Sequence, residues 1–418
     1  MKFIHTADLH LDSPFLGLKN NGLPDELWEK VHQSTFDSFK RIIDGAIEQQ
    51  VDFVLLVGDL FDREERSVAA DAFLINQLNR LKDHEIEAFV SFGNHDYSTA
   101  DPASFGYPAN TQVFGNQVET KRYPLHDGTV VAINGFSFDK QWITQPVIQE
   151  YPQAVSDATW NIGMLHGSLS SLNSPEANYA PFTLSELQEK GYDYWALGHI
   201  HKRQSLNAQG TINYSGNTQG RHINESGEKG YLLVQNEGQQ LTTTFKPTAP
   251  IIWEKVTMSL ADLSTDQLAA SMLEKIADLK YSKLHFIRIE LTSDTNVDPA
   301  ILNQINNGDL LDELQELNTD KWQQLNCWIT SVEAPQVSDV VYSTIDQKYF
   351  NQAREATLND DVFNQVLKDF SKQPAFIKDE VSQADAKHEI YDQAGTILQE
   401  NVVNPDDVEE DSKWLLSN

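Results

Sequence analysis

Five apolar runs in the first half of the sequence lead directly into side chains that commonly bind metal ions, and this pattern constrains the fold most. The residues that follow these runs are Asp8 and His10; Asp59 and Asp62; Asn94, His95 and Asp96; His166; and His199 and His201. Side chains one residue apart on a strand share a face, so His199 and His201 would point the same way. In open α/β sheets, ligands bind outside the carboxyl ends of strands, where all five groups are expected. The sequence therefore predicts a metal-type cluster at these strand ends.

The apolar pattern over residues 1–250 alternates between strand-like and helix-like periods, which predicts a layered α/β domain. Strands are expected near residues 3–7, 51–61, 86–96, 129–138, 160–166, 193–199, 210–216 and 230–236, and helices near 24–47 and 69–81. The run at 51–61 is continuously apolar, as in a sheet that is covered on both faces.

The pattern changes after residue 250. Residues 251–336 are predicted to form a small α/β accessory, or capping, module, and Pro335 is a suitable boundary. Residues 337–418 are predicted to be a helical C-terminal region that carries no candidate chemistry and could bind a partner. The acidic stretch at 404–413 is expected to be a solvated or disordered end.

The charge of the chain limits how it could hold nucleic acid. The formal net charge is −31, and residues 251–418 hold 13 Lys and Arg against 31 Asp and Glu. Neutralising phosphates requires Lys and Arg, so binding through bulk positive charge is excluded. Any contact with nucleic acid must use a local basic patch, a bound cation or a partner.

Cysteine content and hydropathy indicate a cytoplasmic protein. Cys327 is the single cysteine, which excludes an internal disulfide framework, and a Cys-based zinc site would need others. No stretch is apolar and charge-free for long enough to span a bilayer, so we expect no membrane segment. The N-terminus is polar again by Asp8, too early for a secretory signal.

Each of the five groups has an ordinary explanation when it is taken alone. The stretch "GNHD" could be a β-turn, because turns favour Gly, Asn and Asp. Short motifs also have a high false-positive rate. Five groups in a fixed order, all at predicted strand ends, are difficult to obtain by chance.

The order D-x-H, GDxxD, GNHD, H, GHxH resembles the calcineurin-like metallophosphoesterases over about residues 1–250. Within that superfamily, "HTADLHLDSPF", "GDLFDRE" and "LGHIHKRQ" resemble the Mre11/SbcD branch of DNA-repair nucleases. The stretches "PFTLSELQEKGYDYWALGHIHK" and "GNTQGRH" are similar to YhaO-type bacterial exonucleases. The resemblance implies a layered α/β sandwich metallophosphoesterase domain.

The resemblance also implies a ligand scheme for two divalent metal ions. One ion would be held by Asp8, His10, Asp59 and His201, and the other by Asp59, Asn94, His166 and His199. Asp59 would bridge the two ions, and a bridging anion offsets two adjacent dications. Mixed His, Asp and Asn ligation suits Mn, with Fe or Zn as alternatives.

The remaining site residues are expected to act around the metals. By resemblance, His95 is a catalytic histidine that is not a ligand; it acts on the leaving oxygen as a general acid or positions the substrate phosphate, with Asp96 orienting it. Asp62 either holds a ligand histidine or caps the helix that follows. Arg221 and His222 could contact substrate phosphate, or form part of a glycine turn with a surface Arg.

These features predict a metal-dependent phosphodiesterase that acts on DNA, as an exonuclease in DNA repair. The resemblance implies a coiled-coil ATPase of the SbcC/Rad50 kind as partner, and a possible homodimer. A phosphodiesterase for small nucleotides would suit the acidic surface better but the motifs less well. A scaffold or regulatory subunit of the ATPase is the third alternative.

Overall fold

The computed structural model describes residues 1–335, apart from 16–17, 19–21, 63–66, 171–178 and 296, together with residues 362, 363 and 365. The predicted helical region at 337–418, with its acidic end and its expected partner-binding role, lies outside the described residues except at those three positions. Among the residues that are described, every helix is too short or too polar to cross a membrane.

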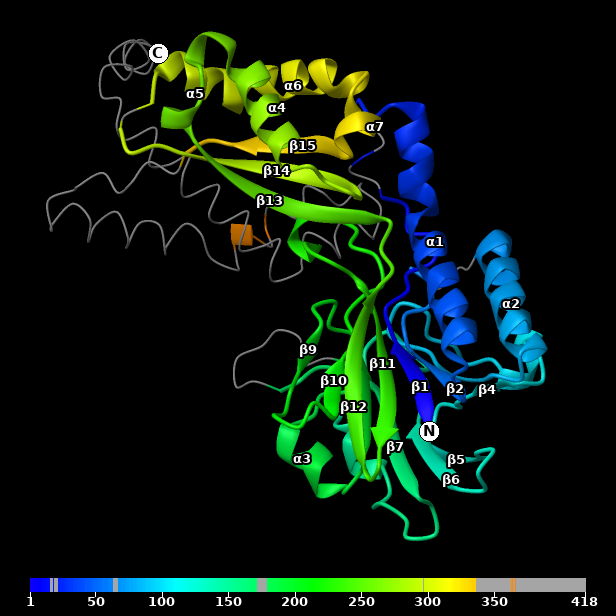
Figure 1. Cartoon of the computed structure of the whole chain (residues 1–418). Coiled ribbons are helices and arrows are strands. Elements are labelled where there is room, and N and C mark those ends of the chain that lie inside the picture. The colour runs from blue at the N-terminus through cyan, green and yellow to red at the C-terminus, as the bar shows by residue number, and fades with distance from the viewer. Residues whose placement is uncertain are drawn as a thin grey trace, which may run out of the picture. The chain divides into compact units, whose positions relative to one another are not determined.

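One six-stranded sheet forms the first half of the core, in the order β12-β11-β1-β2-β3-β4. Its strands are β1 (Lys2–Thr6), β2 (Phe53–Val57), β3 (Glu87–Ser91), β4 (Thr111–Val113), β11 (Gly230–Glu237) and β12 (Gln240–Pro247). Strands β1 to β4 are parallel, and β11 pairs antiparallel with β1. The helices α1 (Asp25–Gln49) and α2 (Val68–Asp83) are the crossovers that parallel strands require, and they lie together on one side of this sheet (Figure 1).

A second six-stranded sheet has the order β5-β6-β7-β8-β10-β9. Its strands are β5 (Glu119–Pro124), β6 (Val130–Gly135), β7 (Trp160–His166), β8 (Tyr194–Gly198), β9 (Gln204–Ser205) and β10 (Ile212–Tyr214), and α3 (Leu184–Glu189) precedes β8. Strands β6, β7, β8 and β10 are parallel. Short 3-10 helices in the described chain are η1 (Pro102–Phe105), η2 (Val147–Glu150), η3 (Ile223–Glu225), η4 (Leu260–Asp262) and η5 (Thr265–Gln267).

The two sheets pack face to face, and β2 shows how its sequence permits this. Phe53, Leu55 and Val57 join the cluster between the sheets, whereas Val54 and Leu56 pack toward α1 and α2. All five side chains are fully buried, because strand residues alternate between faces and both faces are covered. The predicted layered α/β sandwich is confirmed.

A three-stranded sheet, β13-β14-β15, follows the sandwich. Its strands are β13 (Ile251–Ser259), β14 (Leu284–Thr292) and β15 (Cys327–Glu333), and its helices are α4 (Leu268–Asp278), α5 (Pro299–Asn306), α6 (Asp309–Thr319) and α7 (Trp322–Leu325). Figure 1 shows α4, α5 and α6 on one face of this sheet. Residues 251–333 thus have the expected α/β composition.

The chain divides into two compact units whose boundaries differ from the predicted domain boundaries. One unit contains residues 1–291 and 299–333, so the sandwich and the three-stranded sheet belong together. The other contains residues 292–298 and 334–418. The division of the chain at residues 250 and 336 stays a prediction.

Candidate metal centre

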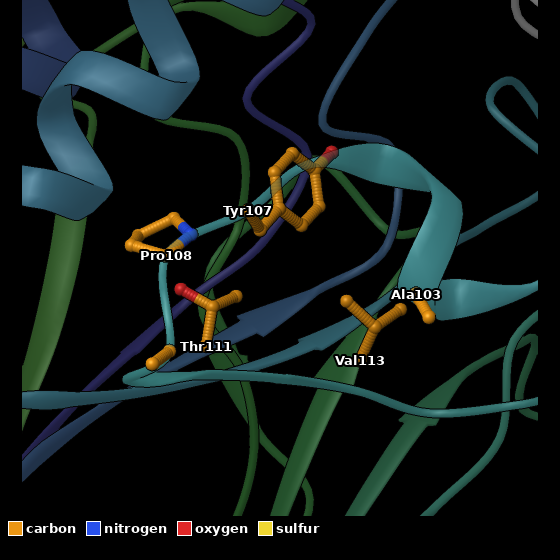
Figure 2. Close-up of a pocket in the computed structure, with 6 residues that line it drawn as sticks. Ala103, Tyr107, Pro108, Thr111 and Val113 are labelled. Carbon is orange, nitrogen blue, oxygen red and sulfur yellow. The ribbon is translucent and has the colours of Figure 1, made fainter.

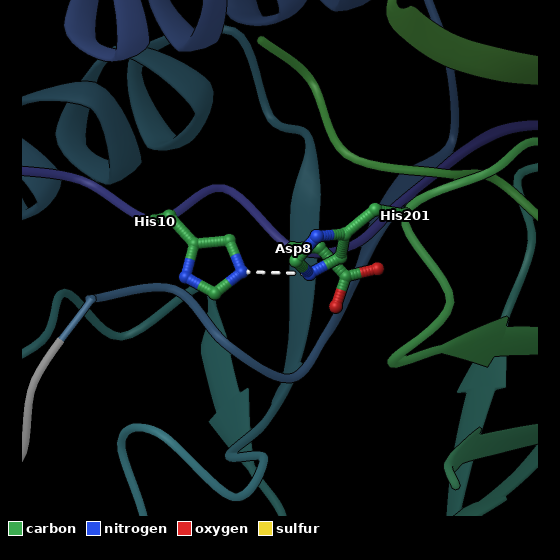
Figure 3. A group of neighbouring side chains, drawn as sticks. All are labelled: Asp8, His10 and His201. Carbon is green, nitrogen blue, oxygen red and sulfur yellow. Dashed lines mark hydrogen bonds between the residues drawn. The ribbon is translucent and has the colours of Figure 1, made fainter. Parts of the chain in front are cut away.

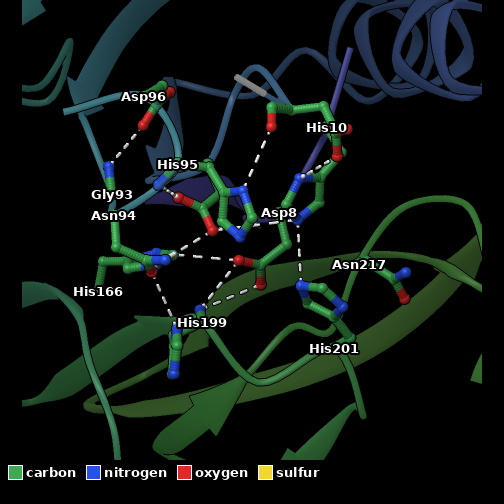
Figure 4. Close-up of polar contacts among 12 residues, drawn as sticks. Asp8, His10, Gly93, Asn94, His95, Asp96, His166, His199, His201 and Asn217 are labelled. Carbon is green, nitrogen blue, oxygen red and sulfur yellow. Dashed lines mark hydrogen bonds and ion pairs between the residues drawn. The ribbon is translucent and has the colours of Figure 1, made fainter. Parts of the chain in front are cut away.

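The carboxyl ends of β1, β2 and β3 in one sheet meet those of β7 and β8 in the other. Strands β2 and β1 contact β8, and β2 also contacts β7. The last residue of β7, His166, and the loops that follow the other four strands carry the five predicted groups, and Figure 4 shows side chains of these groups converging. Parallel strands place their carboxyl ends on one edge, which is why Asp8 and His199, 191 positions apart in the sequence, come together.

The first group consists of Asp8, His10 and His201, whose candidate ligand atoms all lie within 4.8 Å of one another (Figure 3). His10 Nε2 and His201 Nε2 are 3.1 Å apart. Asp8 and His10 are buried, and the His201 side chain is 23% exposed. The group therefore opens to solvent on the side of His201.

The second group consists of Asp59, His166 and His199, again with ligand atoms within 4.8 Å of one another. Asn94 lies between the two histidines of this group. Its Oδ1 is 3.0 Å from His166 Nε2 and 3.1 Å from His199 Nδ1. One amide oxygen and two imidazole nitrogens therefore surround the same small space.

The Asp59 carboxylate joins the two groups. Its Oδ2 is 3.4 Å from His166 Nε2 and 4.0 Å from His10 Nε2, one histidine from each group. Its Oδ1 accepts a hydrogen bond from the backbone N–H of His95 at 2.9 Å. Asp59, the residue predicted to bridge two ions, thus lies between the two groups.

The backbone at these strand ends adopts a conformation that non-glycine residues rarely take. Asp8, His10, Asp59 and His199 all have positive φ, with values of 52°, 44°, 49° and 97°. Such strain persists where surrounding contacts over-determine it, and it clusters at functional sites. Gly93 adds a close approach, because a Cβ there would lie 2.3 Å from Asp59 Oδ1 and 2.7 Å from His166 Nε2.

Two of the histidines are oriented by acceptors on their far side. His166 Nδ1 is 3.1 Å from the carbonyl oxygen of Val57, and His201 Nδ1 is 2.6 Å from Glu225 Oε1. Because these oxygens only accept, Nδ1 of both histidines carries a proton and Nε2 faces the centre. His10 Nδ1 lies 3.2 Å from Asp62 Oδ1, close enough for an ion pair.

Glu225 is a site residue that the sequence pattern did not reveal. It is buried, and besides His201 it accepts hydrogen bonds from Asn217 Nδ2 at 2.9 Å and the backbone N–H of Arg221 at 2.6 Å. It lies in η3, within the stretch "GRHINESG", which has neither an apolar period nor a strand end. The only sequence signal was its position just beyond "GNTQGRH".

Asp62 and Arg221 form an ion pair beside His10. Asp62 does not cap α2, because the Ser67 side chain accepts a hydrogen bond from Ala70 N there. The capping alternative is therefore wrong, and Asp62 contacts a predicted ligand histidine. Arg221 and His222 both approach Glu225 Oε1 at 3.6 Å, so the expected phosphate-binding pair is tied to carboxylates of the site.

His95 and Asp96 are arranged differently from expectation. The Asp96 carboxylate accepts hydrogen bonds from the backbone N–H groups of Gly93 and Leu60, both at 2.7 Å. His95 Nδ1 instead lies 3.2 Å from the carbonyl oxygen of Asp62. Asp96 therefore holds the loops after β2 and β3 together, and a backbone carbonyl orients His95.

The buried charges shift one another's proton affinities. Burial raises the pKa of Asp59, but the histidines around it, His166 foremost, hold it well below its usual range. Burial lowers the pKa of His166, but Asp59 and Asp8 raise it to about 9 overall. Burial, reinforced by the neighbouring His166, lowers the pKa of His199 far below its usual value. The Asp59 carboxylate is therefore ionised inside a ring of imidazoles.

A separate pocket is lined by residues that do not belong to this cluster. Figure 2 shows it beside β4, lined by Ala103, Tyr107, Pro108, Ala109, Thr111 and Val113. None of these lining residues carries a carboxylate or an imidazole. The carboxylates and imidazoles that could bind a metal or transfer a proton lie in the strand-end cluster and not in this pocket.

Comparison with known proteins agrees with this geometry. The sequence profile of the family described as calcineurin-like phosphoesterase matches residues 1–203. The uncharacterized metallophosphoesterase YhaO of Bacillus subtilis is 40% identical over 276 residues, which cover 66% of this chain and 67% of that protein. The chain belongs to the calcineurin-like phosphoesterases.

More distant calcineurin-like relatives are named for DNA repair. The DNA double-strand break repair protein Mre11 of Methanocaldococcus jannaschii is 27% identical, and the match covers 58% of this chain and 64% of that protein, which is less than two thirds of its length. The Mre11 of Sulfolobus acidocaldarius is 23% identical, with coverage of 72% and 78%. A solved dimetal phosphatase from Danio rerio is 9% identical with a TM-score of 0.34, over 58% of this chain and 98% of that one.

Calcineurin-like phosphoesterases depend on two metal ions, and the residues of this chain fit such a pair. His10 Nε2 and His201 Nε2 lie 3.1 Å from each other, beside the Asp8 carboxylate. Three groups of the kind that bind divalent cations therefore face one another. As a member of this family, the chain is a metal-dependent phosphoesterase.

Proposed function

We propose that the chain hydrolyses DNA phosphodiester bonds as a manganese-dependent exonuclease in DNA repair. The observation that carries this proposal is the Asp59 carboxylate between two His-based groups, a donor set for two adjacent dications. The likeness to proteins named Mre11 supports DNA as the substrate class.

The proposed ligand sets follow the two groups. Asp8, His10, Asp59 and His201 would hold one ion, and Asp59, Asn94, His166 and His199 the other. When bound, such a pair activates water and neutralises charge on a phosphodiester. Imidazole and carboxylate donors together suit Mn, and Fe and Zn are the alternatives that metal analysis would distinguish.

Within this proposal His95 is the group that protonates the leaving oxygen or positions the phosphate. Its Nδ1–H donates to the carbonyl oxygen of Asp62, which leaves Nε2 as the atom that exchanges a proton. Its ring lies 5.1 Å from the ring of His10 (Figure 4), and His95, His10 and Asp62 form a third group whose candidate ligand atoms lie within 4.8 Å of one another. The proposed scheme assigns His95 to neither ion. Asp96 and Asp62 position the loops and the ligand histidine around it.

The proposal includes a partner. With a net charge of −31, the chain has little positive charge with which to hold DNA. A coiled-coil ATPase of the SbcC/Rad50 kind, bound through residues 251–336 or the C-terminal region, would supply that grip. A homodimer is proposed on the same likeness to the Mre11 proteins.

The test is manganese-dependent cleavage of end-labelled linear DNA beside bis-p-nitrophenyl phosphate, with the wild type and His95→Ala. Both substrates should be cleaved by the wild type, and the variant should lose about 100-fold or more in rate on both while still binding manganese. Turnover of the small ester without DNA cleavage, even after the ATPase is added, would favour a small-nucleotide phosphodiesterase. An unchanged rate in His95→Ala would remove His95 from the mechanism.

A further inference from the structure

Trp142 is a large aromatic side chain that remains 47% exposed. Within the part of the chain that the structure describes, the exposed large apolar side chains are Val68, Trp142, Leu279 and Val362. Of these four, Trp142 is the aromatic one. Aromatic rings usually bury most of their surface, so its position calls for a physical reason.

The Trp142 ring begins a short row of aromatic rings that ends at the metal centre. Its centroid lies 6.2 Å from that of Tyr179, and the Tyr179 ring lies 4.6 Å from the ring of His199, tilted by 37°. His199 is one of the candidate ligands described above. A half-exposed aromatic surface therefore starts beside the centre and extends outward.

The backbone fixes this row in place. Ile143 and Tyr179 form a parallel bridge, and Ala180 N donates to the carbonyl oxygen of Ile143 at 2.6 Å. Ser168 N also donates to the carbonyl oxygen of Tyr179 at 2.9 Å, two residues after the candidate ligand His166. The two rings are thus anchored to the same strand end that supplies ligands.

The charge of the chain favours an uncharged form of recognition here. Stacking of a base on an aromatic ring needs no Lys or Arg, and it is tolerant of sequence because every base has a π-face. The ring centroids of Tyr179 and His199 are 4.6 Å apart. A phosphodiester at the metal centre would therefore bring the base of an adjoining nucleotide within reach of Tyr179 and Trp142.

We propose that Trp142 and Tyr179 form a stacking subsite for a nucleobase of a DNA strand whose phosphate lies at the metal centre. This inference rests on the proposed function and adds a substrate-binding contact to it. The rings contact the base, and the metal-type ligands contact the phosphate.

The experiment compares binding of a fluorescein-labelled 12-nucleotide thymidine strand with binding of an abasic strand of the same length. Ca²⁺ replaces manganese, and strand integrity is checked on a gel. The wild type should bind the thymidine strand about tenfold more tightly, and Trp142→Ala should reduce this preference to less than about threefold. Trp142→Phe should retain most of it, because a ring remains.

Leu279→Ala is the matched control. It also removes an exposed large apolar side chain, but one that follows α4, an element that supplies no residue to the centre. Its preference should equal that of the wild type. An undiminished preference in Trp142→Ala, or equal or absent binding of the two strands by the wild type, would overturn the inference.

The outcome is separable from that of the proposed function. DNA cleavage by the wild type together with an unchanged preference in Trp142→Ala would reject the subsite alone. Absence of DNA cleavage even after the ATPase is added would reject the exonuclease proposal. A base preference seen with thymidine monophosphate but not with the strand would assign the rings to free nucleotides and overturn the inference for DNA.

Discussion

Glu225 connects four polar groups around a single buried carboxylate. It accepts from His201 Nδ1, Asn217 Nδ2 and the backbone N–H of Arg221, and it lies 3.6 Å from the Arg221 side chain. Burial raises the pKa of Glu225, but Arg221 and His201 together lower it well below its usual range. An ionised carboxylate here accepts the Nδ1–H of His201, which fixes the tautomer and the ring orientation of this candidate ligand.

Replacing Glu225 by Gln should therefore weaken manganese binding. We expect the affinity to fall about 10-fold to 100-fold, because a neutral amide orients His201 less firmly. Titration calorimetry of the metal-free protein measures this change. Glu228→Gln is the control, since Glu228 lies three residues further on but is exposed and pairs with Lys283; equal losses in the two variants would contradict the assigned role.

The buried side chain of His5 should make the stability of the folded chain depend on pH. Its Nδ1 is 3.0 Å from Tyr194 Oη and its Nε2 is 3.1 Å from the Leu197 carbonyl oxygen. Burial lowers the pKa of His5 from 6.5 to about 3, although the hydrogen bond to Leu197 opposes this shift. Between these pH values the unfolded chain binds a proton that the folded chain excludes.

The stabilising contribution of neutral His5 is thus complete above pH 6.5 and is lost as the pH falls toward 3. Its part of the free energy of unfolding should fall by about 1.4 kcal/mol per pH unit in this range. Urea unfolding of the wild type and His5→Gln at pH 7 and pH 5 tests this, with the exposed His84→Gln as control. The prediction fails if His5→Gln and the wild type lose the same stability.

The sequence pattern identified the candidate ligands at the strand ends, but it did not identify the residues that support them. Each candidate ligand of this kind lies at or just after the end of an apolar run, which can be seen in the sequence alone. These residues are Asp8, Asp59, Asn94, His166 and His199. Glu225 and the Val57 carbonyl become neighbours of the site only after two sheets pack. For the same reason, the sequence pattern assigned the orientation of His95 to Asp96, whereas a carbonyl of another loop provides it.

At the scale of elements, β13 holds the loop that carries Glu225. Trp253 Nε1 donates to the Gly220 carbonyl oxygen at 2.8 Å, and Gly227 N donates to the Trp253 carbonyl oxygen at 2.9 Å. The Gln219 side chain donates to the carbonyl oxygen of Ile251 at 2.8 Å. The start of the accessory sheet is therefore bonded to the loop that orients His201.

Trp253→Phe should loosen this loop while preserving ring packing against Phe286. We expect a loss of about 1 kcal/mol in local stability, from the lost hydrogen bond. Faster hydrogen exchange at the backbone amides of Arg221 and Gly227 would show this loss of local stability. We also expect the variant to bind manganese more weakly. Trp328→Phe is the control, because among the described residues its Nε1 has no hydrogen-bond partner; loosening in both variants alike would contradict the prediction.

Helices and strands were predictable from the sequence where their apolar residues followed one clear pattern. The strands β2, β7 and β8 are uniformly buried, and α1 and α2 carry an apolar stripe, so both kinds were expected. The exposed strand β5 and the edge strand β12 were not expected, because their sequences "ETKRYP" and "QLTTTFKP" are largely polar. Helices α5, α6 and α7 were also missed, since polar residues dilute their apolar positions.

At the scale of the whole molecule, metal removal should lower thermal stability. Ligands that bind the folded state alone stabilise it, by about 2.7 kcal/mol at a hundredfold excess over Kd. We expect the Tm to fall by about 4 °C or more when manganese is replaced by EDTA. Asp59→Asn should show a smaller difference, and an equal Tm with manganese and EDTA in the wild type would count against a metal centre.

The proposed ligand set is divided between the two sheets: Asp8, His10, Asp59 and Asn94 come from one, and His166, His199 and His201 from the other. Bound metals would therefore act as a cross-link between segments about 190 residues apart in the chain, which lowers the entropy of the unfolded state as a disulfide does. A chain cut between β4 and β5 would leave four ligands on one fragment and three on the other. High metal affinity would then return only when the fragments reassemble, so metal binding would measure the joining of the two fragments.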